Sequence, residues 1–257
     1  MNIPAHEAEM EIIVQHLDVS LSVLIIGILV TYIAATIQAT IGFGFAMTCV
    51  PILSLIDHQL TPVPQLFALA PLTIGMAWRE RHQADLRGVV WVLLGRVMGA
   101  GIGVYCLTIA SSSVLNMLIG SMVLIAVLLV WQKPNFERTK TTEVTAGTMS
   151  GISALISSIG GPMLALLYRN ESGGTLRASM ASIFVVGLLI TFIARFTSGH
   201  ITIQDAIIGI CFMPPALLGL RTSSSFLSVV EGPFLRWAIL IIAGSASIIL
   251  ICKGAFA

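Results

Sequence analysis

Long apolar stretches, separated by short polar loops, fill almost the whole chain. Several of them approach or exceed the roughly 18 apolar residues that indicate a membrane-spanning helix. We divide the pattern into ten segments, at residues 18–40, 44–57, 63–78, 88–110, 114–131, 144–158, 161–168, 176–197, 204–220 and 234–252. The pattern predicts an all-α polytopic membrane protein.

The composition agrees with this class and excludes several others. Hydrophobic residues make up 56% of the 257 residues and charged residues 10%, whereas a soluble domain carries about 25% charged residues. The first 17 residues contain no Lys or Arg, unlike a secretory signal, and we expect them to form an extracytoplasmic N-terminal segment. The four cysteines stand alone in apolar runs, so no metal site or disulfide framework is expected. The net charge of +1, without a basic tail, gives no indication of a nucleic-acid partner.

The sequence contains an internal repeat. "TIGFGFAMT" from Thr40 aligns with "SIGGPMLAL" from Ser158, and the same offset of 118 residues places His82 over His200. A constant offset over such a distance indicates an internal repeat rather than a chance match. We therefore predict two pseudo-symmetric repeats of about five helical segments each, at residues 18–131 and 144–253. The polar run 132–143 is the predicted cytoplasmic linker.

The basic residues indicate how the two repeats lie in the membrane. Short cytoplasmic loops collect Lys and Arg, and an outside N-terminus places ten basic residues in cytoplasmic loops: Arg79, Arg81, Arg87, Lys133, Arg138, Lys140, Arg169, Arg177, Arg221 and Arg236. Five segments is an odd number, so the second repeat enters from the opposite face and both termini are extracytoplasmic. Such inverted repeats are typical of secondary transporters. If the two short segments do not cross the membrane, the two repeats become parallel, and the Lys and Arg residues agree less well with a cytoplasmic location.

The segments 44–57 and 161–168 are short, and each follows a glycine-rich break. Backbone that is unwound at membrane depth must be buried in protein or line a wet cavity, and the N-terminus of the helix that follows is a natural anion site. Inversion would bring both breaks together near the midplane. The residues predicted to bind substrate there are Gln38, Thr40, Gly42, Phe43, Gly44, Ser157, Ser158, Gly160, Gly161 and Pro162. The alternative for such glycines is close packing of helices.

Three arginines require separate assignments. Arg96 lies within a span, where it is either a functional residue or a side chain that snorkels to the interface. Arg177 opens the span after the second break and is either a substrate ligand or a topology anchor, and Arg195 is expected at the outer rim. No Asp or Glu is expected in mid-span, so a buried carboxylate relay for protons has no carrier. No catalytic cluster or phosphate-binding loop appears, and we expect neither enzymatic activity nor a cofactor.

The two breaks carry a resemblance to a known family. "TIGFGFAMTCVPIL" and "SIGGPMLALLYRNESGGTLRAS" resemble the paired glycine-rich motifs of the sulfite exporter TauE/SafE family, also called toluene sulfonate uptake permeases. Phe43 departs from that pattern, because the family often has glycine there. The resemblance implies a permease of the bacterial inner (plasma) membrane. Its substrate would be a small sulfur-containing anion such as sulfite or an organosulfonate, with H⁺ or Na⁺ as candidate coupling ion and a homodimer as candidate assembly. An anion channel and a non-transporting helical scaffold are the alternatives.

Overall fold

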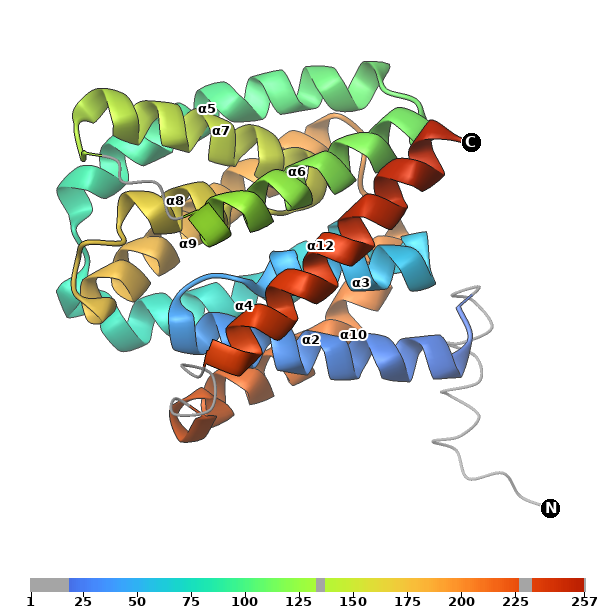
Figure 1. Cartoon of the computed structure of the whole chain (residues 1–257), viewed down its shortest axis with the longest axis horizontal. Helices are drawn as coiled ribbons and strands as arrows, with labels where there is room; N and C mark the ends of the chain where they lie inside the picture. Colours follow the sequence, from blue (N-terminus) through green and yellow to red (C-terminus); the bar gives the residue numbers. More distant parts are fainter. Residues whose placement is uncertain (1–18, 133–136, 227–232, 257) are drawn as a thin grey trace.

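The computed structural model describes residues 19–132, 137–226 and 233–256, and within these ranges every regular element is a helix. The α-helices are α2 (Leu21–Ile41), α3 (Phe45–Ile56), α4 (Val63–Glu80), α5 (Leu86–Ile109), α6 (Ser112–Gln132), α7 (Lys140–Ser157), α8 (Gly161–Leu167), α9 (Gly173–Thr197), α10 (Ile203–Thr222) and α12 (Pro233–Ala255) (Figure 1). The short turns η1 (His58–Leu60), η2 (Arg81–Gln83) and η3 (Ser223–Phe226) join some of them. The all-α prediction is confirmed, and each of the ten apolar segments corresponds to one helix. The expected N-terminal segment lies outside the described residues.

The outer surface of the bundle is apolar, as a membrane protein requires. Six helices in the described part are long and apolar enough to cross a membrane. Large apolar side chains such as Leu29, Leu94 and Val97 are more than half exposed. In a soluble protein these would form large apolar patches, whereas here they lie where lipid would cover them. The chain is therefore a multi-pass membrane protein.

The helices of the two halves pack in matching pairs. α5 packs against α7, and the corresponding pair α10 and α2 packs likewise, while α4 meets α9 and α6 meets α12. Glycine contacts give the directions: Gly120 lies beside Ser247 and Ile251, and Gly254 lies beside Ser113, so α6 and α12 are antiparallel. In Figure 1, α2 and α7 also run in opposite directions, with the start of α2 and the end of α12 at the same side of the bundle.

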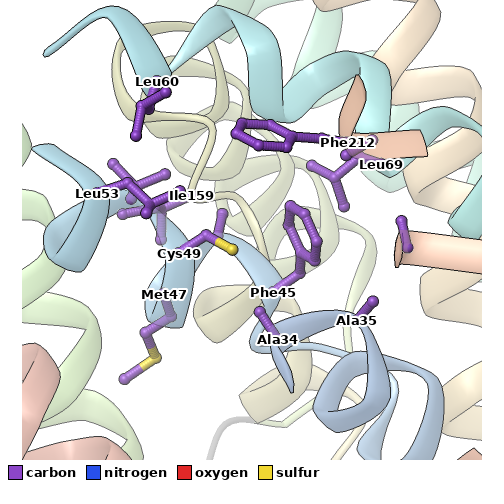
Figure 2. Packing of buried hydrophobic residues seen from close by; sticks show 14 of the residues in the cluster. Ala34, Ala35, Phe45, Met47, Cys49, Leu53, Leu60, Leu69, Ile159 and Phe212 are labelled. Carbon is purple, nitrogen blue, oxygen red and sulfur yellow. The ribbon is translucent and has the colours of Figure 1, made fainter. Parts of the chain in front are cut away.

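The two short helices lie inside the bundle. α3 has 12 residues and α8 has 7, lengths of about 18 and 10 Å that do not span a core of about 30 Å. Most residues of both helices are buried. Figure 2 shows the side chains of α3 among residues of several neighbouring elements, including Ala34, Ala35, Leu60, Leu69, Ile159 and Phe212. Protein therefore surrounds the backbone that would be costly in lipid.

Glycines bring the backbones of α5 and α7 into direct contact. A methyl group added at Gly95 or Gly99 would overlap carbonyl oxygens of α7, and one added at Gly147 or Gly151 would overlap carbonyl oxygens of α5. Only small residues allow helices to approach so closely. This contact sets the position of Arg96, which lies between Gly95 and Gly99 on the same helix.

Ion pairs gather at the end of the bundle that is predicted to be cytoplasmic. The Arg138 guanidinium pairs with Asp85, with Glu143 at 2.9 Å and with Glu171 at 2.6 Å. The hydrogen bond from Arg138 holds the pKa of the Asp85 carboxyl below its usual value. Because Asp85 caps the N-terminus of α5, Glu143 lies in the first turn of α7 and Glu171 precedes α9, this cluster ties three segments together.

Candidate functional site

The first break consists of two glycines in the left-handed region. Gly42 ends α2 with φ 102°, and Gly44 precedes α3 with φ 113°. Residues with a β-carbon adopt such angles only at a cost of roughly 1–2 kcal/mol. This explains the Gly-Phe-Gly sequence, in which the chain turns twice within three residues.

The second break is built differently. Ser158 ends α7 in the left-handed region at φ 60°, which is uncommon for a residue other than glycine. α8 then begins at Gly161, with Pro162 in its first turn, where the missing N–H of proline costs little. The prediction that Pro162 starts a short helix is confirmed.

The two breaks meet around a small cavity. A methyl group added at Gly161 would lie 3.2 Å from Cβ of Phe43, so the second break touches the first. The cavity has a volume of about 40 Å³, which is room for roughly three waters. Its wall contains Gln38, Gly44, Ala46, Met47, Leu66, Leu69, Thr73, Arg96, Ala154, Ser158, Ile159, Gly160, Gly161, Pro162, Phe184, Leu188 and Thr191.

Gln38 and the start of α3 supply hydrogen-bond donors at this wall. Gln38 Oε1 accepts the N–H of Phe45 at 3.2 Å, which directs the amide nitrogen the other way. That nitrogen is buried and has no protein partner in the described part of the chain. The first N–H groups of a helix also have no acceptor within it, and Ala46 and Met47 of that first turn line the cavity.

Arg96 places a cation at the same wall. Its side chain is 3% exposed, so it does not snorkel to the interface. Nη1 donates to Ser150 Oγ at 2.8 Å, and Ser150 Oγ in turn donates to the Gly160 carbonyl at 2.7 Å. Among the described residues, no carboxylate forms an ion pair with Arg96. A buried guanidinium without a counter-ion in the described part of the chain is thus linked directly to the second break.

Two glycines leave room for this guanidinium. A methyl group added at Gly160 would lie 3.0 Å from Arg96 Nη1, and one added at Gly187 of α9 would lie 2.7 Å from Nη2. Either group would compete with the arginine for space, because real contacts of this kind are longer. The position of Arg96 therefore depends on three helices and on the second break.

Five of the twelve predicted site residues lie outside the cavity wall. The Thr40 hydroxyl donates to Thr36 O at 2.7 Å, and the Ser157 hydroxyl donates to Ser153 O at 2.8 Å. Gly42 lies against Leu176 and Arg177, and Phe43 lies against Gly161. The Arg177 guanidinium donates to Glu80 at 2.9 Å. By contrast, Gln38, Gly44, Ser158, Gly160, Gly161, Pro162 and Arg96 all line the cavity.

Arg195 corrects the expectation of a rim residue. It is 3% exposed, and Nη2 donates to the carbonyl oxygens of Leu155 and, at 3.2 Å, Ile156 in the last turn of α7. Arg79 in the last turn of α4 similarly donates to Ala39 O of α2 at 2.7 Å. An arginine in the last turn of α4 thus caps the end of α2, and one in the last turn of α9 caps the end of α7.

Sequence reasoning missed three polar residues near the site, namely Thr73, Ser150 and Thr191. In the structure, Thr73 Oγ1 donates to Leu69 O and Thr191 Oγ1 to Gly187 O within their own helices. Hydroxyls in apolar helices commonly donate to a carbonyl of the preceding turn, so the residue types alone do not mark these positions as part of a site. No group of three potential metal ligands occurs in the part of the chain that the structure describes.

Comparison with known proteins agrees with this architecture. The family model for the sulfite exporter TauE/SafE matches residues 26–250, which include both breaks, the cavity wall and Arg96. No curated protein and no solved structure matched the chain. The match extends over most of the sequence, and the resemblance of the glycine-rich motifs is confirmed. The chain therefore belongs to the sulfite exporter TauE/SafE family.

Proposed function

We propose that this protein is a secondary transporter that carries a small sulfur-containing oxyanion, such as sulfite or an organosulfonate, through the cavity between the two breaks. The family supports transport of a small anion across a membrane. The observation that carries the site assignment is Arg96, a buried cation in the cavity wall without a carboxylate partner in the described residues.

A lone buried cation favours an anionic ligand. Burial of an isolated guanidinium costs several kcal/mol even after the protein relaxes, and ionisable groups at membrane depth usually mark a functional pathway. Among the described residues, Arg96 donates one hydrogen bond, to the neutral hydroxyl of Ser150, which leaves other N–H donors for a ligand because a guanidinium has five. An oxyanion in the cavity would supply both the charge and the acceptors.

The other donors at the wall favour the same occupant. The amide nitrogen of Gln38 has no partner among the described residues, and the N-terminal end of α3 carries the positive end of a helix dipole. Charge-assisted hydrogen bonds to an anion are stronger than neutral ones. The geometry therefore supports an occupant rich in oxygen acceptors, which describes sulfite and sulfonate groups.

The matching helix pairs support transport by alternating access. The set of packed helix pairs is largely preserved when the two halves are exchanged, as expected for inverted repeats around a central site. With the linker on the cytoplasmic side, the ion pairs of Arg138 and Arg177 lie on that side and both termini lie outside. Rocking of one half against the other would expose the cavity to each side in turn.

Reconstitution into liposomes tests the proposal. When an H⁺ or Na⁺ gradient is imposed across the liposome membrane, purified protein should accumulate sulfite against its own gradient, and Arg96→Gln should abolish uptake. Arg87→Gln is the matched control, because Arg87 is on the same helix but is exposed and outside the cavity wall. If Arg96→Gln folds and transports like Arg87→Gln, the site assignment is wrong. Flux that only equilibrates sulfite would identify a channel, and no flux of any small sulfur oxyanion would contradict transport.

A further inference from the structure

We propose that the cavity accepts its oxyanion as a monovalent anion, so that sulfite enters as hydrogensulfite together with its own proton. This inference rests on the proposed transport function and concerns the charge of the substrate. Small monovalent sulfonates would be accepted, and the dianions SO₃²⁻ and SO₄²⁻ would be discriminated against.

The cavity wall carries a positive charge at Arg96. Among the described residues at the wall, Arg96 is the charged side chain, and the others are apolar or neutral. A guanidinium stays protonated in proteins, so the wall contributes one positive charge at any pH that the protein tolerates.

The helices around Arg96 add no second charge to the wall. The charged and titratable side chains with described surroundings on these helices are directed elsewhere or lie outside the wall: Tyr32 on α2, Cys49 on α3, Arg79 and Glu80 on α4, Arg87, Tyr105 and Cys106 on α5, Lys140 and Glu143 on α7, and Arg177 and Arg195 on α9. Arg195, on the same helix as Gly187, donates to the carbonyls of Leu155 and Ile156. Glu80 accepts from Arg79 and Arg177, and Glu143 accepts from Arg138.

Charge balance then selects the monovalent form. One monovalent anion beside Arg96 leaves the buried site neutral, whereas a dianion leaves one net negative charge without a partner. An unpaired charge is heavily penalised away from water. The donors of Gln38 and α3 are dipolar, and they lessen this penalty without supplying a full charge.

The absence of a proton carrier points the same way. In the described part of the spans, carboxylates occur only in terminal turns, as for Glu80, Glu143 and Asp205. Among the described residues at the cavity, a proton that crosses with the substrate therefore has no side chain to carry it. Hydrogensulfite binds and leaves with the proton on the anion, and it equilibrates with SO₃²⁻ and H⁺ in the water on either side.

Cavity size limits the monovalent substrates. The volume of about 40 Å³ corresponds to roughly three waters, which favours a small oxyanion such as hydrogensulfite or a short sulfonate. Methanesulfonate is thus a suitable probe that stays monovalent across the working pH range. Sulfate stays divalent across that range and is the matched dianion.

The test measures apparent affinity for sulfite, methanesulfonate and sulfate in liposomes containing the full-length chain, from mildly acidic to mildly alkaline pH. The affinity for total sulfite should fall in proportion to the remaining fraction of hydrogensulfite. The affinity for methanesulfonate should stay constant, and sulfate should bind at least tenfold more weakly than methanesulfonate. Arg87→Gln should reproduce this profile, which excludes a surface effect, whereas Arg96→Gln should lose affinity for both monovalent anions at least tenfold.

Two results would overturn the inference. A pH-independent affinity for total sulfite would show that the dianion binds equally well, and sulfate binding as tight as methanesulfonate binding would show the same without any titration. In both cases sulfite is still transported, so the proposed function stands and only the charge assignment fails. If none of the three anions binds or moves at any pH, the proposed function itself fails.

Discussion

The Gly44→Ala variant tests whether the backbone geometry of the first break matters for transport beyond its effect on folding stability. Gly44 has φ 113°, and an added methyl group meets only Ile37 Cγ2, at 3.3 Å. The substitution therefore introduces backbone strain with little steric conflict. We expect it to destabilise the fold by roughly 1–2 kcal/mol, the usual cost of a left-handed backbone for a residue with a β-carbon.

Gly44→Ala should reduce the apparent affinity for sulfite more strongly than it reduces folding stability. Relief of the strain rotates the first turn of α3, and with it the N–H groups of Ala46 and Met47 at the cavity wall. Loss of one hydrogen bond to a charged ligand is worth about 1.5–3 kcal/mol, which weakens binding roughly 10- to 150-fold. The assay is the concentration dependence of sulfite uptake in liposomes, normalised to folded protein.

Gly199→Ala is the matched control. Gly199 also has a positive φ, 72°, lies in the loop between α9 and α10, and has open space around an added methyl group. It should lose comparable stability and keep the wild-type affinity. If Gly44→Ala also keeps that affinity, the first turn of α3 is not part of the binding site. If both variants lose transport equally, stability alone explains the effect.

Three further predictions follow from other contacts. Gly187→Ala should displace the Arg96 guanidinium and reduce sulfite uptake at least tenfold, whereas Gly101→Ala on α5, which has open space, should leave uptake unchanged; equal uptake by both would contradict the placement of Arg96. Arg195→Met leaves the carbonyls of Leu155 and Ile156 without this donor and should lower stability by about 1–3 kcal/mol, with partial recovery in Arg195→Lys; thermal unfolding in detergent measures this, and a stable Arg195→Met variant would refute it. Arg138→Gln should destabilise the protein at neutral pH. Because Arg138 lowers the folded pKa of Asp85, this stabilisation is complete above the ordinary pKa of 3.8 and is lost as pH falls through the lowered folded pKa. The stability difference between the two proteins should therefore shrink in acid, and a constant difference would contradict it.

The sequence predicted the helices closely because lipid imposes a simple rule on the chain. Each apolar segment became one helix, and the two segments too short to span became the buried helices α3 and α8. The glycines at 42 and 44 marked the first break correctly because few other residues tolerate its backbone angles. Local chemistry decides such features, so they are visible in one sequence.

The site itself could be predicted only in part. The surroundings of Arg96 depend on Ser150, Gly160 and Gly187, which come from three separate elements. The position of Arg195 near the end of a segment predicts a rim residue, yet it packs against the end of α7. Such contacts arise from how the helices cross, and spacing along one chain does not contain that information.

The paired caps of Arg79 and Arg195 have a consequence for the ion gradients of the membrane. Each guanidinium neutralises carbonyl oxygens at the end of α2 or α7, and these are the groups that would otherwise attract cations at the breaks. What faces the cavity is then the donor end of α3 and Arg96. Oriented dipoles and an arginine are sufficient to exclude cations and protons from a membrane pathway. The fold thus keeps an unwound region inside the bundle from becoming a leak for sodium, potassium or hydronium ions.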